Sequence, residues 1–175
     1  MNKFNFLKKK RSNAFSLVEI IIYLAIFTFV SIFVVNSLII SMSSFSVTHT
    51  NHVLLEGGLS SMDRISREIR QASSIDIANS SLGLDGGVLQ LNSTDSSGSP
   101  ITIKISNVGE AINVYQPADT FVGNLLNGSV VVDSLIFRRV DTTAGEAVKI
   151  EMVLRDTKNN KTENFYNTII LRGAY

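Results

Sequence analysis

SNAFSLVE, residues 12–19, is the stretch that decides the fold of this chain, because it joins a basic segment to a long apolar one. Five lysines and arginines precede it within the first eleven residues. The apolar segment begins within it, and its 26 residues, 15–40, include one charged side chain, Glu19. A helix of that length extends about 39 Å, more than the ~30 Å hydrocarbon core of a bilayer. The pattern predicts a membrane-spanning helix with a cytoplasmic basic leader.

The small residues of this stretch stand on the unusual side of the apolar segment. In a secretory signal peptide the cleavage site follows an apolar region of roughly 7–15 residues. Here Ala14 precedes the apolar region, so cleavage after it would remove the leader and keep the helix. Glu19 is also unusual, because a carboxylate at the bilayer centre costs about 2.5–3.5 kcal/mol and normally has a partner or a function.

The order Ala14-Phe15-Ser16-Leu17-Val18-Glu19 before an apolar run resembles the signal of type IV pilins and type II secretion pseudopilins. That family has a small residue, usually glycine, followed by Phe-Thr-Leu-x-Glu. The resemblance implies that a prepilin peptidase cuts between Ala14 and Phe15 and N-methylates Phe15. The chain departs from the family at Ala14 itself, and at Asn36, where many pilin helices have proline.

The resemblance also implies how subunits would assemble. A carboxylate among apolar helices is best stabilised by a fixed cation. Cleavage creates one, the α-amine of Phe15, which lies about 6 Å from Glu19 along the same helix axis and is also within reach of a neighbouring subunit. The sequence leaves open a second interpretation, that Glu19 extends to the lipid headgroups. The predicted assembly residues are Glu19, Leu17, Ile20, Leu24 and Phe27.

The rest of the chain has the composition of one modest soluble domain. Residues 12–175 contain 11 basic and 15 acidic side chains, a net charge of −4, which argues against nucleic-acid binding. There is no cysteine, so the chain has no disulfide and no thiolate metal site.

Residues 41–74 are predicted to continue the helix as an amphipathic segment. Gly57 and Gly58 mark an expected soft point, since each glycine costs about 1 kcal/mol in a helix interior. Opposite charges four residues apart, Asp63/Arg67 and Arg64/Glu68, are expected on the polar face. The apolar stripe that faces the core is expected to contain Leu55, Leu59, Met62, Ile65, Ile69 and Ala72.

Residues 75–175 change to a strand pattern, with turn signals at 107–110 and 156–161. The chain is therefore divided into a leader (1–14), a transmembrane and assembly helix (15–40), its amphipathic continuation (41–74) and a β-rich domain (75–175). The predicted fold class is α+β, with a long helix packed on one mostly antiparallel sheet, as in pilins. Strands are expected at 88–91, 101–106, 111–115, 134–140, 147–155 and 162–172, and residues 116–128 are expected to be irregular.

A weaker resemblance concerns the subtype. The segments 60–71, 135–139 and 165–172 resemble those of J-type minor pseudopilins and W-type minor pilins. Members of those groups initiate or cap a fibre, so the resemblance implies such a role here.

Three further features contain residue types that occur in chemical sites, and each has a simpler explanation. His49 and His52 share a helix face but have no apparent third ligand. Asp85-Gly86-Gly87 has one carboxylate, which favours a turn over a calcium loop. Arg138-Arg139 is typical of a strand surface. Without a catalytic motif, the sequence predicts neither an enzyme nor a cofactor or metal site.

Two classes of function remain. In the first, the chain is a structural subunit of a type IV pilus, a type II secretion pseudopilus or a DNA-uptake fibre. Its partners would be the prepilin peptidase, other pilins through the N-terminal helix, and the inner membrane, with the C-terminal domain outside the cytoplasm. In the second, it is an unprocessed single-pass protein that tethers a binding domain to the membrane.

Overall fold

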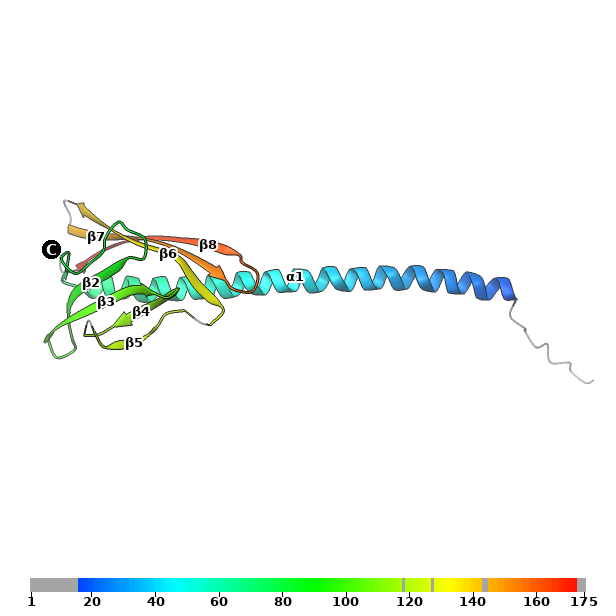
Figure 1. The fold of residues 1–175 in the computed structure, drawn as a ribbon, viewed down its shortest axis with the longest axis horizontal. Helices are drawn as coiled ribbons and strands as arrows, with labels where there is room; N and C mark the ends of the chain where they lie inside the picture. The colour runs from blue at the N-terminus through cyan, green and yellow to red at the C-terminus, as the bar shows by residue number, and fades with distance from the viewer. Residues whose placement is uncertain (1–15, 118, 127, 143–144, 173–175) are drawn as a thin grey trace, which may run out of the picture. The chain divides into compact units, whose positions relative to one another are not determined.

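The computed structural model describes residues 16–117, 119–126, 128–142 and 145–172 (Figure 1). It divides into two compact units, Met1–Ser46 and Val47–Tyr175. The helix α1, Leu17–Gln71, contributes to both. In the first unit its apolar side chains are exposed, and the helix is long and apolar enough to cross a membrane.

The second unit contains two antiparallel sheets where the sequence predicted one. We call the five-stranded sheet, with strand order β1-β2-β3-β4-β5, sheet A, and the three-stranded sheet, with order β6-β7-β8, sheet B. The strands of sheet A are β1 (Ser74–Ile75), β2 (Val88–Thr94), β3 (Pro100–Val108), β4 (Ala111–Tyr115) and β5 (Phe121–Asn124). Those of sheet B are β6 (Val130–Thr142), β7 (Gly145–Asp156) and β8 (Thr162–Ile170). With the helix, they confirm the α+β class.

Both predicted turns join neighbouring strands. Gly109 and Glu110 connect β3 to β4 with positive φ angles of 60° and 65°, as a two-residue hairpin turn requires. The second turn connects β7 to β8 and contacts the helix, where Asn159 Nδ2 donates to Thr50 Oγ1 at 2.5 Å and Lys161 Nζ donates to Asn51 Oδ1. The end of sheet B is therefore held to the first turns of α1 in this unit.

The apolar stripe of α1 is shifted by one residue from the prediction at its N-terminal end, and Met62, Ile65, Ile69 and Ala72 are buried as predicted. Leu55 and Leu59 were assigned to the core, but they are 46% and 63% exposed. Leu54 and Gly58 occupy the buried positions, and they share a face with the correctly predicted core residues. Both alternatives fit a 3.6-residue period, so the partner surface decides between them. The buried apolar side chains on this face are Leu54, Met62, Ile65, Ile69 and Ala72.

The surroundings of Gly58 explain this shift of the buried face. They also explain why α1 is continuous through the soft point that the sequence predicted at Gly57 and Gly58. The ring of Phe165, on β8, lies directly over its backbone. A Cβ atom at Gly58 would stand 2.1 Å from Cζ of that ring. The glycine therefore lets sheet B approach the helix closely, and the packing maintains the helix despite the lower propensity of glycine.

The two predicted ion pairs on α1 form, although one carboxylate is not on the solvent face. Arg67 contacts Asp63 at 2.5 Å, and Arg64 contacts Glu68 at 2.7 Å. Glu68 is buried, so its pairing with the half-exposed Arg64 compensates for the loss of water.

The outer edge of β6 is covered by two loops. Val132 N donates to Glu110 O at 2.9 Å, Gly87 N donates to Leu135 O at 2.8 Å, and Gly83 N donates to Phe137 O at 2.7 Å. A covered edge cannot pair with another chain.

Candidate membrane and assembly segment

The predicted cleavage junction, Ala14 and Phe15, lies outside the described residues. The helix begins directly after it, at Leu17. Ser16 is in the N-cap position, since its carbonyl oxygen accepts from Glu19 N at 3.0 Å and Ile20 N at 3.2 Å. A cut at the predicted junction would thus leave a helix that starts two residues into the mature chain.

Glu19 lies in the first turn of α1, where the helix dipole stabilises a negative charge. The hydroxyl group of Tyr23 donates to Glu19 Oε1 at 2.9 Å. Sequence reasoning missed this contact, although a tyrosine four residues after a carboxylate is a usual neighbour on a helix. The bond occupies one carboxylate oxygen and leaves Oε2 for a second donor.

The predicted apolar assembly residues are exposed, and three of them form one surface. Ile20, Leu24 and Phe27 form an exposed apolar patch together with Tyr23. Leu17 is 74% exposed and does not belong to the patch. A contiguous apolar surface of this kind requires lipid or another apolar helix to cover it.

Two hydroxyl groups in the same helix are satisfied without water. Thr28 Oγ1 donates to Leu24 O, and Ser43 Oγ donates to Ile40 O, each at 2.8 Å. Hydrogen bonds of this local kind let serine and threonine reside in a water-free environment.

The remaining candidate sites have protein partners. His52 lies 3.6 Å from Glu56, and no cluster of three metal-ligating side chains occurs among the described residues. Asp85 Oδ1 accepts from Ser134 Oγ at 2.8 Å and from Leu135 N at 3.1 Å. These hydrogen bonds, with that from Gly86 N, lower the pKa of Asp85. Asp85 therefore fastens its loop to β6.

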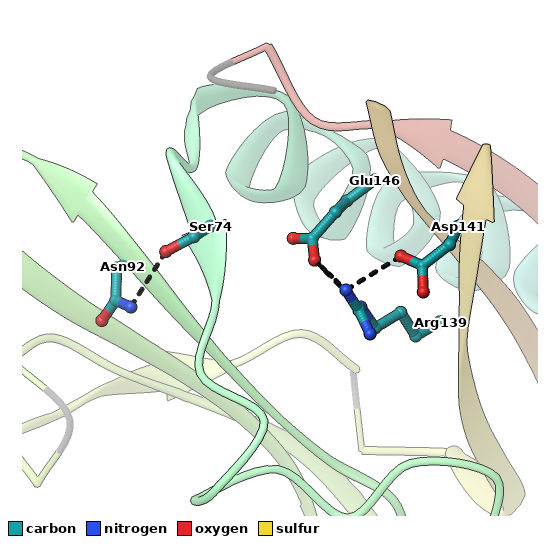
Figure 2. A network of polar contacts seen from close by, with 5 residues as sticks. All are labelled: Ser74, Asn92, Arg139, Asp141 and Glu146. Atoms are coloured by element: carbon teal, nitrogen blue, oxygen red, sulfur yellow. Dashed lines mark hydrogen bonds and ion pairs between the residues drawn. The ribbon is translucent and has the colours of Figure 1, made fainter. Parts of the chain in front are cut away.

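The two neighbouring arginines of β6 are also engaged by carboxylates. Arg138 contacts Glu151 at 3.2 Å. Figure 2 shows Arg139 between Asp141, at 2.9 Å, and Glu146 at the end of the β6–β7 hairpin. The hydrogen bond to Glu146 raises the pKa of Arg139. These contacts agree with a strand-surface role.

No family model, curated protein or solved structure matches this chain.

Proposed function

We propose that this chain is a minor pilin or pseudopilin, a structural subunit of a type IV pilus, a type II secretion pseudopilus or a DNA-uptake fibre. The observation that carries the proposal is the Ala14-Phe15 junction, which stands before the apolar helix and five residues upstream of Glu19. The α+β arrangement, in which both sheets follow one long helix, is consistent with a pilin layout.

The proposal assigns a distinct task to each part. The basic leader keeps the N-terminus in the cytoplasm until the prepilin peptidase removes it and methylates Phe15. The apolar part of α1 holds the subunit in the inner membrane and later packs against other subunits. The unit Val47–Tyr175 is presented outside the cytoplasm.

Glu19 would set the axial register between neighbouring helices. Its carboxylate accepts from Tyr23 on one oxygen, and the other is available for the α-amine of Phe15 in the same or the adjacent subunit. An ion pair is directional and costly to leave unmade in an apolar environment, whereas the contacts of Ile20, Leu24 and Phe27 are not directional.

The test is to map the mature N-terminus. We expect mass spectrometry of the protein from its native membrane to find a chain that begins at N-methyl-Phe15. Ala14→Gly should be processed at least as well, and Ala14→Lys should block cleavage. An intact leader in a peptidase-competent cell would instead support the unprocessed membrane-tethered domain.

A further inference from the structure

A groove of about 730 Å³ runs between α1 and β8 in the second unit. The last turns of α1 form one wall, and the end of β8 with residues 171–172 forms the other. Its volume lies within the roughly 300–1,000 Å³ range of ligand sites.

The groove is lined by the two arginines of the described residues that form no ion pair. Seven arginines lie in the described part of the chain, and five of them form ion pairs. Within the described residues Arg70 and Arg172 have no such partner, and both line the groove. The carboxylate that lines it, Asp63, is bound to Arg67. Arg70 also benefits from the C-terminal helix dipole, but Arg172 is not on the helix.

The other wall of the groove is a sheet edge. β8 is the last strand of sheet B, and its outer side has no strand partner among the described residues. On this edge Thr168 N donates to the side chain of Asn167 at 2.9 Å, and Asn167 Nδ2 donates to Ser66 Oγ at 3.1 Å. A side-chain cap is replaceable, because an incoming backbone carbonyl can accept from Thr168 N in place of Asn167.

We propose that this groove binds an acidic, extended polypeptide segment of a partner protein. Its carboxylates pair with Arg70 and Arg172, and its backbone aligns with the edge of β8. The arginines alone would also suit a phosphate, but the strand edge offers backbone groups at the spacing of another polypeptide. The inference does not depend on the assignment to a fibre.

The experiment uses the full chain in detergent micelles and a fluorescein-labelled seven-residue peptide that alternates glutamate with valine. Fluorescence anisotropy at low ionic strength measures the affinity. We expect the double variant Arg70→Gln/Arg172→Gln to weaken binding at least tenfold. The control is Lys158→Gln, which removes an exposed cation away from the groove and should leave the affinity within twofold.

A second probe separates the strand edge from charge alone. The same peptide with every backbone amide N-methylated keeps its carboxylates but has no N–H group to donate to a strand on either edge, so it should bind the native chain at least fivefold more weakly. Equal affinity for the two peptides would show a simple anion site and overturn the proposal. Displacement of the labelled peptide by inorganic phosphate, added at the same concentration of negative charge as the peptide, would do the same. So would a loss in Lys158→Gln as large as in the double variant, or no saturable binding at millimolar peptide. The N-methylated probe needs no variant, so the test survives if the double variant misfolds.

Discussion

Neighbouring glycines in α1 provide a matched test of how sheet B packs on the helix. Gly57→Ala and Gly58→Ala make the same chemical change in the same helix, and each gains about 0.5–1 kcal/mol of helix propensity. Their surroundings differ. A Cβ at Gly57 would meet Val130 at 3.9 Å, an ordinary contact, whereas one at Gly58 would meet three ring atoms of Phe165 at 2.1–2.5 Å.

The size of the effect follows from that difference. Carbon atoms pack best at about 3.5–4.0 Å, so the ring of Phe165 must retreat by more than 1 Å to admit the methyl group of Gly58→Ala. Phe165 is buried, and such overpacking costs roughly 1–3 kcal/mol. Because the propensity terms cancel, this packing cost is the expected gap between the two variants. Gly57→Ala should be more stable than the native chain, and Gly58→Ala less stable.

Urea unfolding of the full chain in detergent, monitored by the circular dichroism of the sheets, measures the free energy of unfolding of both variants. Adding Phe165→Leu to Gly58→Ala provides a further control, since a smaller side chain leaves room for the methyl group. The double variant should be destabilised by less than the sum of the single changes. If Gly58→Ala proves as stable as Gly57→Ala, the close approach of β8 to the helix is refuted.

Three further outcomes are expected. Ile65→Asp should lower the free energy of unfolding by about 3–5 kcal/mol, because it buries an unpaired charge. Leu59→Asp, at an exposed position of the same helix, should change it by no more than about 0.5 kcal/mol. Equal losses of the two variants in urea unfolding would contradict the observed helix face. The folded-state pKa of Asp85 is lowered from its ordinary value of 3.8, so its contribution to stability is present above that value and lost as the pH falls through the folded-state pKa. Asp85→Asn should therefore reduce the loss of unfolding free energy as the pH falls below about 4, and parallel stability curves for the native chain and the variant would argue against this role. Glu19→Ala should be inserted into the membrane and cleaved but fail to crosslink with fibre partners. Tyr23→Phe, which loses one hydrogen bond, should still assemble. Normal incorporation of Glu19→Ala into the fibre would reject the pairing role of Glu19.

The strands and turns that have a clear pattern in their own residues were predicted from the sequence. The alternation in 147–155 corresponds to β7, and the Gly109-Glu110 turn joins the strands expected around it. The strand β5 was missed, since its four residues are mostly exposed and lack alternation. It forms because it pairs with β4 across a register shift, a tertiary cause that its own sequence does not carry.

The orientation of α1 could not be predicted for the same reason. A helical period accommodates Leu55 and Leu59 as well as Leu54 and Gly58, and hydrophobicity favours the pair with two leucines. The position of Phe165, distant in sequence, decides otherwise. In the candidate site, the junction and Glu19 could be proposed from the sequence because they belong to one contiguous motif, and they stay a prediction. Tyr23 was recognised only when the helix geometry placed its hydroxyl group on the carboxylate.

The covered edge of β6 gives sheet B only one direction in which it can grow. Backbone groups at Val132, Leu135 and Phe137 are already bonded to loops, whereas the edge of β8 carries a side-chain cap at Thr168. A strand can therefore be added to sheet B at β8 but not at β6. Copies of this chain cannot pair through both edges of sheet B, so this sheet cannot propagate a continuous β-assembly. In the assembly we propose, elongation is left to the helices.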